Sequence, residues 1–238
     1  MEASDLRIKI FADGADIAAM LKLAENPLIK GFTTNPTLMR KAGISDYAGF
    51  AKEVVRQITD RPISFEVFSD EFDAMEHQAL IINSWAENVY VKIPITNTRA
   101  ESAAPLIHKL SHQGLKLNIT AMTTLEQVKE VGDAVRGGAP SFISVFAGRI
   151  ADTGCDPLPI MKDSLNILNS SPGAELLWAS PREVLNIVQA DAIGCPIITV
   201  TPDLLAKLGT LGKDLKDFSL DTVKMFYRDA QAAGFQIG

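Results

Sequence analysis

The stretch Asn88–Ile95 reads Asn-Val-Tyr-Val-Lys-Ile-Pro-Ile, a run of β-branched and apolar residues typical of a buried strand. Side chains alternate between the two faces of a strand, so its valines and isoleucines share one apolar face and Lys92 lies on the other. Pro94 has no N–H to donate to a neighbouring strand, and the strand should therefore end near it. We expect Lys92 to lie close to the carboxyl end of its strand.

Seven further runs of this kind occur along the chain, and helical patterns separate them. The eight predicted strands are Arg7–Asp13, Gly31–Asn35, Pro62–Phe68, Asn88–Ile95, Lys116–Ala121, Phe142–Gly148, Glu175–Ser180 and Pro196–Val200. The predicted helices are Ala15–Ala24, Asp46–Ile58, Glu71–Ala86, Arg99–Gln113, Thr124–Arg136, Pro157–Leu168, Pro181–Asp191 and Pro202–Leu208. Parallel strands need crossover connections, so this α/β pattern predicts a single (β/α)8 TIM barrel over residues 1–238, with an extra C-terminal helix at 219–235.

An open, doubly wound sheet would also alternate strands with helices. Its nucleotide-binding form carries a G-x-G-x-x-G run directly after a strand, and the sequence contains no such run. The segment Gly209–Lys213 does not match a phosphate-binding loop either, because its glycines lie too close together. The barrel is therefore the favoured fold.

The composition excludes several classes of protein. Lys and Arg total 23 and Asp and Glu total 29, so the net charge of −6 argues against a nucleic-acid partner. The N-terminus lacks a basic segment followed by an apolar one, and no apolar run approaches the roughly 20 residues of a membrane span. We expect a cytoplasmic protein with no membrane partner. Cys155 and Cys195 suggest neither a disulfide scaffold nor a metal site.

Polar residues share the inward-facing side of several predicted strands, near the ends where barrel active sites lie. They are Asp13, Glu66, Lys92, Asn118, Thr120 and Ser144, with Phe68 and Phe146 on the same side. An ion pair of Lys92 with Glu66 would explain part of this set as purely structural. Buried polar groups without partners cost free energy, so a set of this size favours a functional site.

A buried lysine suggests one kind of chemistry. Loss of hydration lowers the pKa of a buried amine, and a neutral amine can attack a carbonyl to form a Schiff base. Two carboxylates in different surroundings could then transfer protons at different steps. No metal or other cofactor is expected, because His108 and His112 have no third ligand and His77 shows no motif.

Five segments resemble motifs of the transaldolase family and follow in the family's order. They are Gly31–Thr37, Val89–Ile95, Leu117–Thr120, Ser144–Ile150 and Ala179–Arg182. The resemblance spans about residues 8 to 208, and the chain is similar in length to the small transaldolase and fructose-6-phosphate aldolase subgroup.

The resemblance implies a metal-free carbon–carbon cleavage through a lysine Schiff base. Lys92 would bind C2 of a ketose phosphate, and Asp13 would take the proton of the C4 hydroxyl. Glu66 and Thr120 would hold a water that shuttles protons. The implied substrate-binding residues are Thr34, Asn35, Asn118, Ser144, Phe146, Arg149, Ser180 and Arg182, of which the two arginines and Ser180 would hold the phosphate.

Two positions separate the subgroups. The small fructose-6-phosphate aldolases typically carry Gln and Tyr where this chain has Glu66 and Phe146, which match the transaldolase pattern. We therefore expect transfer of a dihydroxyacetone unit from fructose 6-phosphate or sedoheptulose 7-phosphate to an aldose phosphate, in the pentose phosphate pathway. Simple aldol cleavage, a sulfosugar transaldolase and a non-catalytic sugar-phosphate-binding barrel are the alternatives. Pro181 and the 152–159 segment border the expected anion site and depart from the family pattern, so the sequence is also compatible with a substrate that carries a sulfonate in place of the phosphate.

The predicted last helix carries an apolar stripe after the barrel should be complete. Leu220, Val223, Phe226 and Tyr227 form this stripe. It could pack against its own barrel. In the small members of the family such a tail helix packs on a neighbouring subunit, so the resemblance implies a homo-oligomer.

Overall fold

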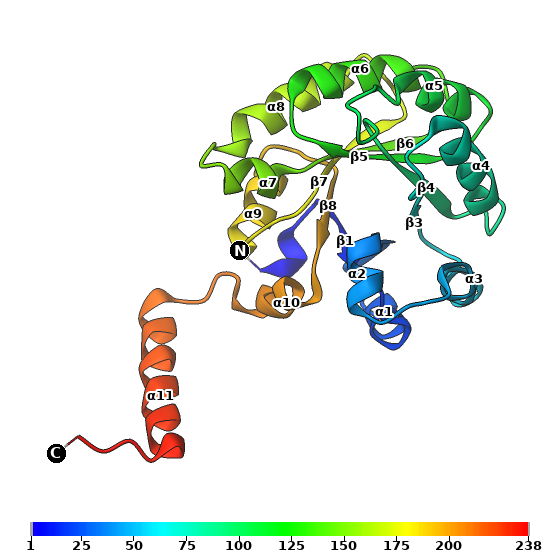
Figure 1. The fold of residues 1–238 in the computed structure, drawn as a ribbon. Helices are drawn as coiled ribbons and strands as arrows, with labels where there is room; N and C mark the ends of the chain where they lie inside the picture. Colours follow the sequence, from blue (N-terminus) through cyan, green and yellow to red (C-terminus); the bar gives the residue numbers. More distant parts are fainter. Residues whose placement is uncertain (1, 238) are drawn as a thin grey trace.

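Eight parallel strands close into a barrel in the computed structural model, which describes residues 2–237 (Figure 1). Each strand pairs with the next along the chain, and the last pairs with the first. The strands are β1 (Lys9–Asp13), β2 (Ile29–Thr33), β3 (Ile63–Glu66), β4 (Val89–Pro94), β5 (Leu117–Met122), β6 (Ser141–Val145), β7 (Ala174–Trp178) and β8 (Ile197–Val200). The predicted (β/α)8 barrel is confirmed.

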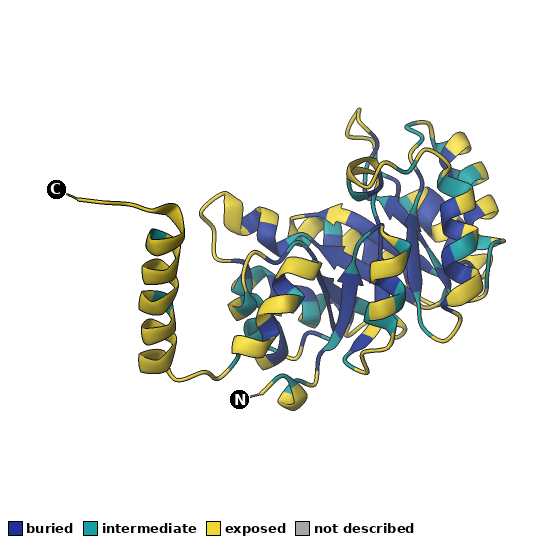
Figure 2. Ribbon diagram, turned by 90° about the horizontal axis from the view of Figure 1, so that it is seen from below, coloured by how far each residue is buried: buried dark blue, intermediate teal, exposed yellow. Residues whose placement is uncertain are grey.

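Helices surround the barrel and expose only their outer faces (Figures 1 and 2). They are α1 (Ile17–Ala24), α2 (Pro36–Lys41), α3 (Tyr47–Gln57), α4 (Phe72–Asn83), α5 (Ala104–His112), α6 (Leu125–Val135), α7 (Ala147–Asp152), α8 (Pro157–Leu168), α9 (Val184–Ala192) and α10 (Pro202–Leu205). Short 3-10 segments lie at η1 (Ala3–Asp5) and η2 (Ala206–Thr210), and α11 (Leu215–Ala233) ends the chain. The capping box that starts α6 pairs Thr124 with Gln127, as their spacing indicates.

Several predicted boundaries are wrong. Residues 147–152 form helix α7, so β6 ends at Val145. The predicted helix start at Pro181 lies too early, because Glu183 is the N-cap of α9 and its side chain forms a reciprocal capping box with Asn186. Arg182 therefore lies on the loop after β7. The inward placement of Phe68 is also wrong, since β3 ends at Glu66 and the Phe68 side chain is 61% exposed.

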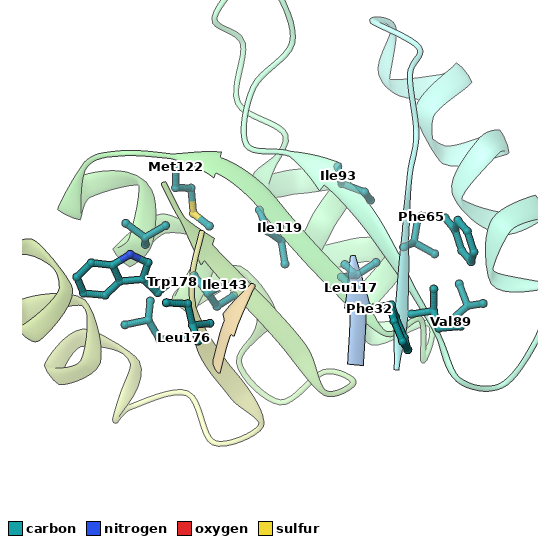
Figure 3. Close-up of a cluster of buried hydrophobic side chains, with 14 of the residues drawn as sticks. Phe32, Phe65, Val89, Ile93, Leu117, Ile119, Met122, Ile143, Leu176 and Trp178 are labelled. Carbon is teal, nitrogen blue, oxygen red and sulfur yellow. The ribbon is translucent and has the colours of Figure 1, made fainter. Parts of the chain in front are cut away.

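The main hydrophobic core lies between the outer face of the barrel and its helices. Each strand contributes every second side chain to this layer, including the fully buried Phe32, Phe65 and Trp178 (Figure 3). Burial of such large side chains contributes roughly 1.5–3 kcal/mol each to the free energy of unfolding. The continuous outer layer holds the strands in one register, and this register decides which residues face inward.

A second, smaller cluster fills the interior of the barrel. The edge of one ring meets the face of the other between Phe11 and Phe142, with ring centroids 5.4 Å apart, and Phe142 stacks on Tyr90 with centroids 4.0 Å apart. Gly31 makes room for this layer, because a Cβ atom there would lie 2.7 Å from the Phe11 ring. We call these three rings the aromatic layer. It places the polar residues further along the strands in a cavity above it.

Helix α11 extends away from the barrel, and none of its residues is buried (Figures 1 and 2). It begins four residues before the predicted start because the side chain of Asp214 accepts a hydrogen bond of 2.8 Å from the N–H of Lys216. It ends at Gly234, whose φ of 65° suits glycine. The helix does not pack on its own barrel, so this alternative is wrong.

Candidate active site

A cavity of about 510 Å³ opens at the carboxyl ends of the strands. Its lining comes from every strand except β7, from the loops after β2, β6 and β7, and from α2 and α7. The lining residues are Asp13, Thr33, Asn35, Pro36, Thr37, Leu38, Lys41, Glu66, Lys92, Asn118, Thr120, Ala121, Ser144, Phe146, Arg149, Ala179, Ser180, Arg182 and Thr199. Of the predicted site residues, only Thr34 does not line this cavity.

Lys92 lies on β4 with its side chain inside the barrel, and the residue is only 7% exposed. Its Nζ atom lies 3.3 Å from a carboxylate oxygen of Glu66 and donates a hydrogen bond of 3.2 Å to the carbonyl oxygen of Thr34. Glu66 and Lys92 are lateral neighbours in the register of β3 and β4. The predicted ion pair therefore exists, and it lies in the wall of an open cavity.

Asp13 ends β1 and lines the same cavity as Lys92. The Thr33 hydroxyl donates a hydrogen bond of 2.9 Å to its carboxylate and is itself hydrogen-bonded to the Thr199 hydroxyl. Burial raises the pKa of Asp13, while the positive charge of Lys92 and the Thr33 hydrogen bond partly oppose that rise. A carboxyl with a raised pKa accepts a proton more readily than an ordinary aspartate.

A hydrogen-bonded row crosses the cavity floor from β6 to β3. The hydroxyl of Ser144 donates to the amide oxygen of Asn118 at 2.6 Å, and the Asn118 amide nitrogen donates to the Ser64 hydroxyl at 2.9 Å. These contacts fix the orientation of the Asn118 side chain. The buried Thr120 hydroxyl has no hydrogen-bond partner among residues 2–237, and Thr120 lines the cavity. It is therefore available to bind a polar group there.

The loop after β2 brings two predicted residues to the site in different ways. The side-chain oxygen of Asn35 accepts a hydrogen bond of 3.0 Å from the N–H of Leu38, which starts α2 and leaves the amide NH2 for the cavity. Thr34 is fully buried, and its hydroxyl donates to the carbonyl oxygen of Ser64 at 3.1 Å. Thr34 therefore reaches the site through its backbone carbonyl group.

The predicted anion-binding residues come from two loops that touch. A Cβ atom at Gly148 would lie 1.5 Å from the carbonyl oxygen of Ser180, so only glycine allows this approach. Ser180 adopts a φ of 58°, an uncommon conformation for serine. Arg149 follows Gly148 on α7 and lies on the cavity wall with Ser180 and Arg182.

Arg182 already has a carboxylate partner in this structure. Its Nε atom donates a hydrogen bond of 3.0 Å to Asp152, and a second nitrogen binds the other oxygen of that carboxylate. The bond holds the pKa of Asp152 below its usual range. The pairing holds the guanidinium group in one orientation at the rim of the cavity.

Sequence reasoning missed four residues that belong to this site. Thr33 and Thr199 lie on the inward side of β2 and β8, and the alternation that identified Lys92 could have found both. Lys41 and Asp152 lie at the ends of α2 and α7, two six-residue helices that were not predicted. No sequence pattern indicated Lys41, and Asp152 was noted only as the first residue of the 152–159 segment beside the anion site.

Other candidate features do not form sites. Within residues 2–237, no group of three or more His, Cys, Asp or Glu side chains is arranged to hold a metal ion. The rings of His108 and His112 contact each other at a tilt of 39°, and each binds a backbone carbonyl oxygen through Nδ1. Burial raises the pKa of the Cys195 thiol to about 12. No helix in the described part of the chain is long and apolar enough to cross a membrane.

The fold and the cavity together define a class: a (β/α)8 barrel with a polar cavity around a buried lysine, where the enzymes of this fold carry their active sites. The chain belongs to the transaldolase/fructose-6-phosphate aldolase family, whose model matches residues 10–237. It is a transaldolase-type enzyme.

Named relatives agree with this membership. The chain is similar to a probable transaldolase 2 of Listeria monocytogenes, with 35% identity over 202 residues, which cover 84% of this chain and 88% of the relative. It is 32% identical to a probable transaldolase of Thermoanaerobacter over 224 residues, 94% of this chain and 98% of the relative. A probable transaldolase of Streptococcus pyogenes is 34% identical over 202 residues, 84% of this chain and 90% of the relative.

Proposed function

We propose that the protein is a class I transaldolase that moves a dihydroxyacetone unit between sugar phosphates through a Schiff base on Lys92. The observation that carries the proposal is the position of the Lys92 Nζ atom, 3.3 Å from the Glu66 carboxylate in a cavity that also contains Asp13. Family membership fits sugar-phosphate substrates. The donor would be fructose 6-phosphate or sedoheptulose 7-phosphate in the pentose phosphate pathway of the cytoplasm.

The first half of the reaction forms the covalent intermediate. Lys92 gives a proton to the Glu66 carboxylate and attacks C2 of the ketose, and further proton transfers through Glu66 and a water held with Thr120 convert the carbinolamine to an iminium by loss of water. Asp13 then removes the proton of the C4 hydroxyl. The C3–C4 bond breaks, its electrons move into the iminium, and the aldose phosphate leaves.

The second half of the reaction transfers the dihydroxyacetone unit to an acceptor. The bound dihydroxyacetone enamine attacks the aldehyde of a second aldose phosphate, and the reverse proton transfers release the new ketose. Asn35, Asn118 and Ser144 would hold the hydroxyls of the three-carbon unit, with Thr34 contributing its carbonyl group to Lys92. Arg149, Ser180 and Arg182 would hold the phosphate, for which Arg182 exchanges its bond to Asp152.

Chemical trapping tests the proposal directly. Incubation with fructose 6-phosphate and borohydride should add a dihydroxyacetone-derived mass to the peptide that carries Lys92, and Lys92→Ala should abolish it. Lys116→Ala is the matched control, because Lys116 precedes β5 at the other end of the barrel and binds the carbonyl oxygen of Glu87. An adduct on a different lysine would contradict the mechanism. If an adduct forms with a sulfosugar but not with fructose 6-phosphate, the protein is a sulfosugar transaldolase. If no sugar gives an adduct, it is a non-catalytic sugar-phosphate-binding barrel.

We also propose that the protein forms a homo-oligomer through α11. Its apolar side chains are exposed in the described chain, including Val223, Phe226 and Tyr227, each at least 60% exposed. Removal of such a surface from water is favourable, and a second copy of the chain would supply a partner. Analytical ultracentrifugation should show an assembly that Phe226→Glu dissociates; a monomer at micromolar concentration would contradict it.

A further inference from the structure

The hydroxyl group of Tyr47 binds both backbone polar groups of one residue, Glu66. It donates a hydrogen bond of 2.9 Å to the Glu66 carbonyl oxygen and accepts one of 2.7 Å from the Glu66 N–H. Tyr47 is the first residue of α3, whereas Glu66 ends β3. A side chain from outside the sheet thus takes both positions that a neighbouring strand normally fills.

The register of β2 and β3 shows why a substitute is needed. The N–H of Phe32 donates to the carbonyl oxygen of Pro62, and the N–H of Thr34 donates to that of Ser64. The next step of this parallel ladder would take an N–H from residue 36 to the carbonyl oxygen of Glu66. Residue 36 is Pro36, which has no N–H and begins α2. The ladder from β2 therefore ends one residue pair too early for Glu66.

The backbone carbonyl oxygen of β2 that should accept the N–H of Glu66 accepts a different hydrogen bond. A continued ladder would direct the N–H of Glu66 to the carbonyl oxygen of Thr34. That oxygen instead accepts the hydrogen bond from Nζ of Lys92, while the Glu66 N–H binds Tyr47. The phenol thus leaves the Thr34 carbonyl available to the lysine.

The surroundings of Tyr47 hold its ring in place. Its ring meets those of Phe65, Phe68 and Trp85, with centroid distances of 6.4, 5.2 and 6.0 Å. Burial raises the pKa of the phenol, which therefore keeps its proton and can donate and accept at the same time.

We propose that Tyr47 is a positioning residue of this site: its hydroxyl replaces the missing β2 partner of Glu66 and so holds the Glu66 carboxylate beside Lys92. The inference rests on the proposed function, because Tyr47 acts through the proton-transferring Glu66. It predicts that the hydroxyl, and not the ring, sets the rate at which the Schiff base forms.

Tyr47→Phe keeps the ring contacts and removes both hydrogen bonds to Glu66. Tyr90→Phe is the matched control, because it removes a hydroxyl from the aromatic layer of the same barrel, away from Glu66. With fructose 6-phosphate and borohydride, Tyr47→Phe should form the Lys92 adduct about tenfold more slowly or worse, the scale expected for a misplaced catalytic group. KM should change little, and the control should match the unaltered protein.

A double variant distinguishes positioning from general loss of structure. Tyr47→Phe should add no further slowing to Glu66→Gln, because the two residues act as a unit. A crystal structure of Tyr47→Phe should show the Glu66 carboxylate moved away from Lys92. In the unaltered protein, the Glu66 amide should exchange its hydrogen as slowly as the amides within β3, although it lies outside the ladder of β2.

The role of Tyr47 would be overturned by any of three results. They are a double variant slowed by the product of the two single effects, a Tyr47→Phe variant that is trapped at the full rate, and rapid hydrogen exchange of the Glu66 amide. These outcomes leave the proposed function standing, provided that the unaltered protein is trapped at Lys92. Absence of any adduct in the unaltered protein would overturn the proposed function itself and this inference with it.

Discussion

Lys92 and Glu66 stand side by side on neighbouring strands, and their charged groups approach to 3.3 Å. A buried ion pair contributes little net free energy to folding, because the loss of hydration offsets the attraction. Stability alone therefore gives a weak reason for this pair at the mouth of a barrel. The proposed Schiff-base chemistry of Lys92 gives a stronger reason.

The two carboxylates should act at different steps. Glu66→Gln should slow formation of the trapped adduct, because Gln cannot accept the protons of carbinolamine dehydration. Asp13→Ala should leave an adduct trappable on Lys92, now with the mass of the uncleaved fructose 6-phosphate, while release of glyceraldehyde 3-phosphate slows by about 10²-fold or more, the scale of positioned acid–base catalysis. Mass spectrometry follows the first quantity and a coupled assay the second. Equal loss of trapping in both variants would show that the roles are divided wrongly.

Phe146 should decide between transfer and release. Its ring lines the cavity and has no proton to give, so the enamine should persist until an acceptor aldehyde arrives. With fructose 6-phosphate alone the protein should stall after one turnover, and erythrose 4-phosphate should restart it. Phe146→Tyr should raise the steady-state ratio of free dihydroxyacetone to transferred product. If the unaltered protein releases dihydroxyacetone as fast as it transfers it, the protein is an aldolase.

Gly148→Ala should damage the proposed anion-binding end of the cavity. The added Cβ atom would force the Ser180 carbonyl group away and displace Arg149, so KM for phosphorylated substrates should rise about tenfold or more. Overpacking of this kind also costs about 1–3 kcal/mol of unfolding free energy. Gly209→Ala is the control, because nothing lies within 4 Å of a Cβ atom built there. An unchanged KM would show that the two loops do not set substrate affinity.

Asp13→Asn should lower activity and raise the stability of the folded protein, by an amount that depends on pH. Folding raises the pKa of Asp13, so between the unfolded value of about 3.9 and the raised folded value the native state binds more protons than the unfolded state. This contribution to stability therefore falls as pH rises through that window. The variant should melt at a higher temperature than the unaltered protein at pH 7, and the difference should vanish below about pH 4. Calorimetry across this range checks the sign.

Strand alternation predicted most of the site. The rule that places Lys92 inside the barrel also places Asp13, Asn118 and Ser144 there, because eight strands of one parallel sheet share a single inner face. The structure places these residues in the cavity, whereas their roles in the reaction stay predictions. The alternation failed at Phe68, where the strand ends earlier than its apolar run.

Short helices and contacts between distant residues could not be predicted from the sequence. Helices α2 and α7 have six residues each, too few for a helical period to stand out. The start of α9 was misplaced because Pro181 suits the first turn of a helix, whereas the φ of 58° at Ser180 keeps the chain in a loop. The bond between Tyr47 and Glu66 joins residues 19 positions apart and depends on where β2 ends.

The aromatic layer beneath Lys92 has a consequence for the order of events. In the described part of the chain, Phe11, Phe142 and Tyr90 fill the barrel below the cavity, so ligands enter and leave through one mouth. A departing aldehyde and an incoming one would occupy the same space above the lysine. A transferase built this way must discharge its first product before it admits the second substrate. Its initial-rate plots at several fixed acceptor concentrations should therefore be parallel lines, the kinetic signature of a ping-pong sequence.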